Sequence, residues 1–221
     1  SAAGLGLSLP PAAELRAAVE ATIAANDAAG VGRLRITITG GPSPLGSTRG
    51  DEPPTVLIIA TPAEPWPATT RAVTVPWPRN EQSATAGLKT ISYADNVVAL
   101  AYARQRGAGE AIFPNLAGNL CEGTGTNVFV GIHGRLVTPP LTSGCLAGIT
   151  RELLLERGVA EEADVPMTAL AVADEAFLTS STREVQPICH IDDRALPGCP
   201  GLLTRTATHT FAGLLARDRD P

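Results

Sequence analysis

The residue of this chain with the clearest chemical potential is its only lysine. Lys89 stands alone among the 17 lysine and arginine residues of the 221-residue sequence. A solvated surface cation can be either residue type, but an ammonium group can also lose its proton when desolvated and attack a carbonyl carbon. Lys89 is therefore a candidate Schiff-base lysine. An ordinary surface lysine is the alternative at this position, so the assignment of Lys89 depends on the neighbouring motifs.

Three segments that follow Lys89 have the composition of a site for an anionic cofactor. Residues 118–127 place Glu122 beside a turn rich in glycine and threonine. Residues 146–151 lead into a helical run, and the free backbone amides at a helix N-terminus attract phosphate. Residues 179–182 offer hydroxyl groups at the end of an apolar strand.

Four motifs, in this order, resemble the class IV aminotransferase family, which are the fold-type IV pyridoxal-phosphate enzymes. They are Gly87-Leu88-Lys89-Thr90-Ile91-Ser92-Tyr93-Ala94-Asp95-Asn96, then Glu122 with Asn127-Val128-Phe129, then Gly148-Ile149-Thr150-Arg151, and Ser180-Ser181 before Glu184-Val185. The resemblance runs from about residue 33 to about residue 191. The family includes branched-chain aminotransferases, D-amino acid aminotransferases and 4-amino-4-deoxychorismate lyases.

The resemblance implies a mixed α/β (α+β) architecture with two domains, as in other fold-type IV enzymes. We expect a small N-terminal α/β domain over residues 1–84 and a larger, pseudo-barrel, cofactor-binding domain over residues 85–221. The polar, small-residue stretch 79–86 is the candidate boundary. A homodimer is expected, because relatives place the site near a subunit interface.

Pyridoxal 5'-phosphate is the cofactor that the resemblance implies. The resemblance also assigns two residues to the reactive end of this cofactor. Lys89 would carry the cofactor in an aldimine and move the proton at the reacting carbons of the substrate. Glu122 would pair with the pyridine nitrogen and keep it protonated, so that the ring accepts electrons. A solvated loop carboxylate is the alternative for Glu122.

The resemblance also assigns residues to the phosphate group of the cofactor. The backbone amides of Ile149 and Thr150, the Thr150 hydroxyl, and the hydroxyls of Ser181 and Ser180 would hold it. Thr126 is a further candidate contact. Hydroxyls of this kind also form turns and helix caps, which is the alternative for each of them.

Arg35 is the candidate for binding the substrate. Residues 34–39 alternate with period two, which predicts a strand with Arg35 and Thr37 on one face. Arg35 then either faces solvent or binds a substrate carboxylate. The family's phosphate-binding arginine would lie before Ser1, and the first residues read like a connector, so we expect a preceding segment.

Among the activities of the family, the sequence favours 4-amino-4-deoxychorismate lyase, which forms 4-aminobenzoate and pyruvate. The paired glycines that commonly follow the lysine in branched-chain enzymes are absent, and residues 34–37 and 86–89 look more like the lyase branch. A class IV aminotransferase acting on D-amino or branched-chain amino acids is the first alternative. A non-catalytic anion-binding module is the second.

Composition limits the other partners. The net charge is −5, no basic run is present, and only four Phe, two Trp and two Tyr could stack on bases, which argues against nucleic acid. Apolar stretches such as 97–103 are far shorter than the ~18 residues of a membrane span. A small amino compound is the expected partner.

The cysteines and histidines give no sign of a metal site. The four cysteines form no C-x-x-C pair and the three histidines are far apart in sequence, so we expect no metal and no disulfide framework. Reduced thiols in a cytoplasmic protein are predicted at Cys121, Cys145, Cys189 and Cys199.

Hydrophobic periodicity and turn residues predict the elements that would position these groups. Ser92 with Asp95 resembles a capping box before the second helix. The expected helices are 12–26, 93–106, 149–157 and 203–216, and the expected strands are 34–39, 55–60, one ending at Val75, 111–113, 127–131 and 135–137, the last two joined at His133-Gly134.

Overall fold

The computed structural model describes residues 1–26 and 30–218. Backbone contacts divide the chain into two units, Ser1–Trp66 and Pro67–Pro221. This division comes earlier in the chain than the boundary expected after residue 84. The reason is strand β3 (Thr70–Thr74), which pairs in parallel with β4 and β10 of the large sheet. Residues that follow Trp66 therefore fold with the second unit.

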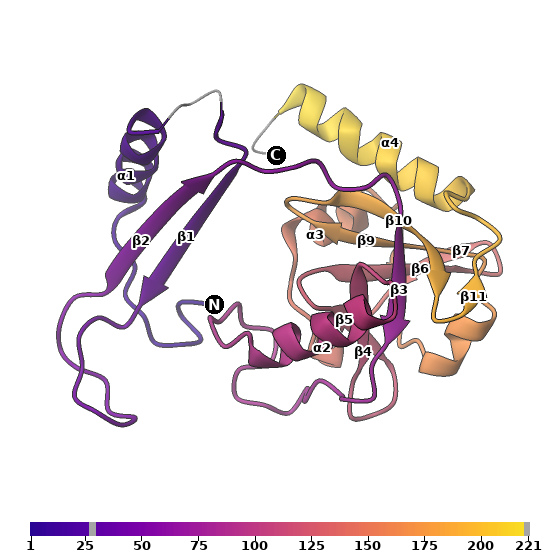
Figure 1. The fold of residues 1–221 in the computed structure, drawn as a ribbon, viewed down its shortest axis with the longest axis horizontal. Coiled ribbons are helices and arrows are strands. Elements are labelled where there is room, and N and C mark those ends of the chain that lie inside the picture. Colours follow the sequence, from indigo (N-terminus) through magenta and orange to yellow (C-terminus); the bar gives the residue numbers. More distant parts are fainter. Residues whose placement is uncertain (27–29, 219–221) are drawn as a thin grey trace. The chain divides into compact units, whose positions relative to one another are not determined.

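The first unit is a helix against a two-stranded sheet (Figure 1). Helix α1 (Ala12–Ala24) contacts β2 (Thr55–Thr61), which pairs antiparallel with β1 (Arg33–Thr39). The predicted helix and both predicted strands are confirmed. The register pairs Arg35 with Ile59 and Thr37 with Leu57, so Arg35 and Thr37 share a face as their alternation predicted.

In the described residues of the second unit, nine strands form one mixed, curled sheet, which confirms the predicted α/β class. Its order is β5-β4-β3-β10-β9-β6-β7-β8, with β11 paired to β10. Beyond β3, the strands are β4 (Glu110–Pro114), β5 (Leu120–Gly123), β6 (Asn127–Ile132), β7 (Arg135–Thr138), β8 (Glu161–Glu162), β9 (Glu175–Ser180), β10 (Glu184–Ile191) and β11 (Arg194–Ala195).

Alternation along the strands separates two apolar layers. Val128 and Val130 of β6 lie in the core inside the curled sheet, whereas Phe129 between them lies in a second cluster. The Phe129 ring stacks on that of Phe177 in β9, with ring centroids 4.7 Å apart. Leu178, the next residue of β9, returns to the inner core. Strands β6 and β9 therefore each contribute side chains to both layers.

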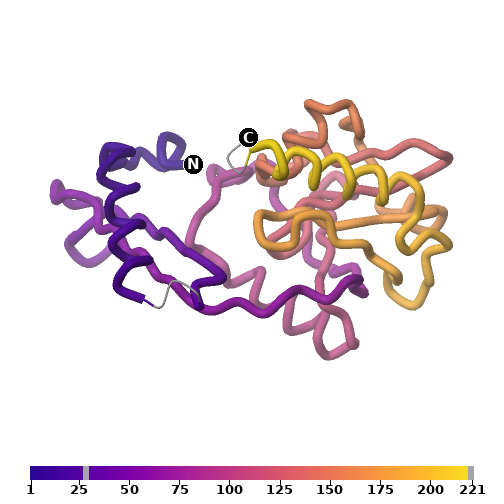
Figure 2. The backbone as a smooth tube through the Cα atoms, turned by 90° about the horizontal axis from the view of Figure 1, so that it is seen from above, coloured from indigo at the N-terminus to yellow at the C-terminus, as the bar shows by residue number. Residues whose placement is uncertain are grey.

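Three helices cover the sheet. Helix α2 (Ala94–Gln105) packs on β4, and α3 (Ile149–Glu156) and α4 (Leu202–Arg217) contact each other and β9. Figure 2 shows α4, in yellow, running along the orange strands β9 and β10. These helices agree with the predicted ones to within one residue at each end. No helix in residues 1–26 and 30–218 is long and apolar enough to cross a membrane.

The predicted capping box at α2 is wrong. The N-cap residue of α2 is Tyr93, and no side chain caps the helix. Ser92 lies one position too early for this role, and its N–H donates to Thr90 Oγ1 at 3.2 Å. The entry into α2 is therefore set by a local turn that follows Lys89.

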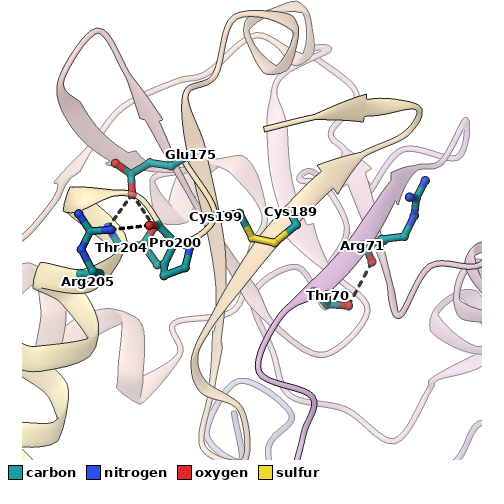
Figure 3. Close-up of a disulfide and its surroundings, with 8 residues drawn as sticks. All are labelled: Thr70, Arg71, Glu175, Cys189, Cys199, Pro200, Thr204 and Arg205. Carbon is teal, nitrogen blue, oxygen red and sulfur yellow. Dashed lines mark hydrogen bonds between the residues drawn. A yellow bond between two sulfur atoms is a disulfide. The ribbon is translucent and has the colours of Figure 1, made fainter. Parts of the chain in front are cut away.

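The prediction of four reduced cysteines is wrong for one pair. Cys189 in β10 and Cys199 form a disulfide, with Cα atoms 5.0 Å apart (Figure 3). The β10–β11 hairpin turns the chain back and brings these two positions together. Cys121 and Cys145 are free and buried, as predicted for core thiols.

A buried carboxylate fixes the start of α4. Glu175 of β9 accepts hydrogen bonds from the N–H of Leu203 at 3.1 Å, from the N–H of Thr204 at 2.7 Å and from the Thr204 hydroxyl at 2.6 Å. Figure 3 shows Glu175 directed at Thr204. The N-cap residue Gly201 carries no capping side chain, so a strand residue satisfies the free amides.

Candidate functional site

Glu122 in β5 is held by one hydrogen bond and one ion pair, which come from different parts of the chain. Its Oε2 atom accepts from Leu146 N at 2.9 Å, and its Oε1 atom lies 3.1 Å from Arg79 Nε. The side chain is 15% exposed. Burial raises the pKa of Glu122, whereas the Leu146 N–H and the Arg79 charge act in the opposite direction. The carboxylate is thus oriented in a place with little water.

Lys89 lies within electrostatic reach of that carboxylate. The charge of Lys89 also acts to lower the pKa of Glu122, after the Leu146 and Arg79 contributions. The lysine segment runs beside the Leu146 segment, because a Cβ atom on Gly87 would lie 3.5 Å from Cys145 O. Lys89 itself is exposed in this structure, whereas its proposed chemistry predicts a desolvated amine. The exposure follows from its place in a surface turn before α2.

Asn127, the first residue of β6, fixes the loop that leads into α3. Its Nδ2 atom donates to Leu146 O at 2.7 Å. Gly148 packs so closely on this side chain that a Cβ atom there would overlap Asn127 Oδ1. Gly148 is the N-cap residue of α3 and has no capping side chain. The free amides of Ile149 and Thr150 therefore begin the helix beside Asn127.

The turn that carries Ser180 and Ser181 reaches the same end of the sheet. In the β6–β9 register Thr179 lies opposite Asn127, so the following serines come next to the start of β6. Ser180 Oγ accepts from Arg183 N at 3.1 Å, which shapes the turn into β10. Ser181 is exposed. The hydroxyl turn and the start of α3 thus flank one residue, Asn127.

Thr126 has a different environment. Its hydroxyl donates to Glu110 Oε2 at 3.2 Å, and Glu110 also accepts from Thr124 N at 3.1 Å. Arg183 lies 3.2 Å from the same carboxylate. Burial lowers the pKa of Arg183, and the charge of Glu110 partly offsets this effect. A cofactor contact through the Thr126 hydroxyl would require it to exchange this hydrogen bond.

Arg35 lies in the other unit. It is exposed on β1, on the face that it shares with Thr37. Arg35 belongs to the first unit and Glu122 to the second, so a contact between Arg35 and a substrate carboxylate stays a prediction.

Two thiols lie close to Glu122 without being chemically available. Cys121 Sγ donates to Ser143 O at 3.2 Å, and both Cys121 and Cys145 are buried. Burial raises the pKa of the Cys121 thiol strongly, and the Glu122 charge adds to this effect. Burial also raises the pKa of Cys145. These thiols are protonated core groups at neutral pH, and they are not nucleophiles.

Sequence reasoning missed Arg79, Glu110 and the role of Asn127. Arg79 is one of many arginines and carries no local signal. Glu110 begins a strand whose next three residues are apolar, so a carboxylate there could have been recognised as a buried structural group. Asn127 belonged to a recognised motif, but its bond to Leu146 depends on how the loop folds back.

Comparison with known proteins agrees with this geometry. The family described as amino-transferase class IV matches residues 1–191. The D-alanine aminotransferase of Bacillus licheniformis is 38% identical over 124 residues, which cover 53% of this chain and 44% of that protein. A solved branched-chain aminotransferase from the archaeon Thermoproteus uzoniensis, with norvaline, is 30% identical with a TM-score of 0.84, covering 99% of this chain and 76% of that one.

A third similarity concerns the fold alone. A structure from Legionella pneumophila named "putative 4-amino-4-deoxychorismate lyase" has a TM-score of 0.87 at 21% identity, covering 98% of this chain and 81% of that one. The matched region spans only part of the curated relatives: 44% of the length of the Bacillus licheniformis D-alanine aminotransferase and 60% of the length of a second relative. The family match covers most of the sequence, and the large sheet has the fold-type IV architecture of these structures. This chain therefore belongs to the class IV aminotransferase family of pyridoxal-phosphate enzymes.

Proposed function

We propose that this chain binds pyridoxal 5'-phosphate and contributes the cofactor site of an enzyme that acts on a small amino compound. One observation carries the proposal. Glu122 is oriented by Leu146 N–H and Arg79, Lys89 lies within electrostatic reach of it, and the segment that binds Glu122 continues into the N-terminus of α3. A lysine, an acid and a phosphate-binding helix start thus lie along one connected set of contacts.

The residues present fit this cofactor. Pyridoxal phosphate needs a lysine, an acid at its ring nitrogen, and amide and hydroxyl donors for its phosphate. Gly148 adds no side-chain atom of its own at the helix start, where a Cβ atom would overlap Asn127 Oδ1. The bound cofactor would supply an electron sink for the substrate carbon next to the amino group.

Each residue then has a defined task. Lys89 would hold the cofactor through its amine and move a proton at the substrate carbon. Glu122 would keep a proton on the ring nitrogen. Ile149 and Thr150 would bind the phosphate through their backbone amides, and the Thr150 hydroxyl would add a donor.

Ser181, together with Ser180, would complete the phosphate site from the β9–β10 turn. We further propose that Arg35 binds the substrate carboxylate and that the enzyme works as a homodimer, as its family resemblance implies.

Transamination is the reaction that the comparisons support most. The relatives at 30% identity or more reported above are named as aminotransferases for D-alanine or branched-chain amino acids. The lyase reaction, which the sequence favoured, is the second candidate. The observation behind it is that Thr90 and Ile91 follow Lys89 where branched-chain enzymes commonly carry paired glycines. A transaminase needs a keto acid to complete its cycle, and the lyase does not.

The cofactor assignment is tested by loading the chain with pyridoxal phosphate, reducing it with borohydride and mapping the peptides. A pyridoxyl group on Lys89 is expected, with none in Lys89→Arg, which keeps the charge but cannot form the linkage. A loaded chain that gives no adduct on Lys89 would overturn the proposal in favour of a non-catalytic anion-binding module.

The two reactions are then separated with substrates. Formation of 4-aminobenzoate and pyruvate from 4-amino-4-deoxychorismate without a keto acid would identify the lyase. Turnover of D-alanine or a branched-chain amino acid that requires a keto acid would identify the transaminase.

A further inference from the structure

Arg79 pairs with Glu122 and contacts both β4 and α2, although no sequence motif pointed to it. Its side chain is 19% exposed. The backbone N–H of Arg79 donates to Pro114 O at 2.8 Å, and the side-chain Nη2 atom donates to Asn96 Oδ1 at 2.7 Å. Its guanidinium carbon lies 3.9 Å from the centroid of the Phe113 ring. Strand β4 and helix α2 thus fix its position from different directions.

This fixed cation meets one oxygen of Glu122, while a backbone amide meets the other. Arg79 Nε lies 3.1 Å from Oε1, and Leu146 N lies 2.9 Å from Oε2. An ion pair at one oxygen and a hydrogen bond at the other restrict how the carboxylate can turn. A guanidinium is planar and permanently charged, so it can supply a fixed orientation that a flexible ammonium cannot.

We propose that Arg79 is a positioning residue, which orients the Glu122 carboxylate and keeps it ionised toward the ring nitrogen of the cofactor. The identity of the cofactor rests on the proposed function. The coupling between Arg79 and Glu122 does not, because it is a property of the chain itself.

Electrostatics gives the reason why such a residue is needed. Burial raises the pKa of Glu122, so the buried carboxyl tends to hold its proton. Arg79 and Lys89 are the cations that oppose this tendency, and the neighbouring thiols Cys121 and Cys145 interact with the carboxylate as well. A protonated Glu122 would have no charge to offer a pyridinium nitrogen. Arg79 therefore favours the ionised form of Glu122.

The first test uses the cofactor-free chain. The carboxyl carbon of Glu122 is followed by NMR as a function of pH, with Glu122→Gln to assign the signal. The pKa of Glu122 is expected to rise in Arg79→Gln and to return most of the way in Arg79→Lys, which restores the charge. Arg135→Gln is the matched control, because Arg135 pairs with Glu161 at the surface, where both side chains are at least 50% exposed.

The second test measures binding of pyridoxal phosphate by absorbance. Arg79→Gln is expected to weaken binding about tenfold or more, which corresponds to roughly 1.4 kcal/mol. In the Glu122→Gln background the same substitution is expected to change binding less than twofold, because Arg79 acts through Glu122. The affinity of Arg79→Lys for pyridoxal phosphate should lie between those of wild type and Arg79→Gln, since Lys keeps the charge but lacks the planar guanidinium group.

The outcomes separate this proposal from a purely structural role. If Arg79→Gln lowers thermal stability but leaves the Glu122 titration unchanged, Arg79 only joins α2 to β4 and the proposal is wrong. Equal effects on binding in the two backgrounds would also overturn it. If Arg79→Gln does not fold, an unchanged Glu122 titration together with wild-type binding in Arg79→Lys would exclude the orienting role.

A chain that fails to bind pyridoxal phosphate would contradict the proposed function. The NMR titration would still decide whether Arg79 controls Glu122.

Discussion

Glu122 and Asn127 bind opposite sides of the same backbone residue. Leu146 N–H donates to Glu122 Oε2 at 2.9 Å, and Leu146 O accepts from Asn127 Nδ2 at 2.7 Å. The acid at the end of β5 and the start of α3 are therefore positioned by one shared loop residue. A change in the side chain of Glu122 or Asn127 is therefore expected to move both the acid and the start of α3.

Replacement of Glu122 by Gln should change how stability depends on pH in the cofactor-free chain. The pKa of Glu122 is raised above its ordinary value of 4.5, so the folded state binds this proton more tightly than the unfolded state. Its contribution to stability is complete below pH 4.5 and is lost as the pH rises through the raised value. Gln does not titrate, so Glu122→Gln should gain stability relative to wild type as the pH rises above 4.5.

Urea unfolding at a series of pH values measures this difference. A stability difference that stays constant, or that moves in favour of wild type as the pH rises, would contradict the raised pKa.

Replacement of Gly148 by Ala should disturb the start of α3. The new Cβ atom would overlap Asn127 Oδ1, so the Asn127 side chain or the helix has to move. A loss of about 1–3 kcal/mol is expected, as for other overpacked sites. Pyridoxal phosphate should also bind more weakly, because the amides of the first helical turn shift. Denaturant unfolding and an absorbance titration give the two values.

Gly213→Ala is the matched control. Gly213 lies inside α4 and a Cβ atom there meets no atom within 4 Å, so Ala should stabilise by about 0.5–1 kcal/mol. Equal losses in the two variants would show that the contact with Asn127 is not the cause.

Replacement of Glu110 by Gln should destabilise the turn that follows Glu122. The fully buried carboxylate accepts from Thr124 and Thr126 and faces Arg183, whose side chain is 7% exposed. Removal of one charge from a buried pair costs about 3–5 kcal/mol. Chemical denaturation measures the loss. Glu161→Gln removes a carboxylate from a surface pair and should cost less than about 1 kcal/mol.

The free thiols Cys121 and Cys145 should resist alkylation in the folded chain. Burial raises the pKa of both, and thiolates are the reactive form. Iodoacetamide at pH 8 is expected to modify neither until urea is added. Peptide mass spectrometry identifies the modified residues. Rapid labelling of Cys121 in the native chain would show that the site around Glu122 opens to solvent.

The sequence alone determined features that depend on near neighbours in the chain. The hairpin at His133-Gly134 and the helix starting at Ile149 follow from local periodicity and turn chemistry, and both are confirmed. Lys89 and Glu122 were selected by residue type and surroundings, and the family match agrees with the motif order. The capping box failed even locally, because the helix start shifted by one residue.

Only the tertiary structure decided which distant groups meet. Two contacts join segments that are separate in the chain: the Arg79–Glu122 ion pair and the hydrogen bond from Thr126 to Glu110. The Cys189–Cys199 disulfide joins the two ends of a folded-back hairpin. The division after Trp66 likewise depends on β3 joining a sheet in which its partner β10 lies more than a hundred residues later, with Thr70 beside Ile188. Sequence periodicity indicates which face of an element is buried. The element that packs against that face depends on how the whole sheet is arranged.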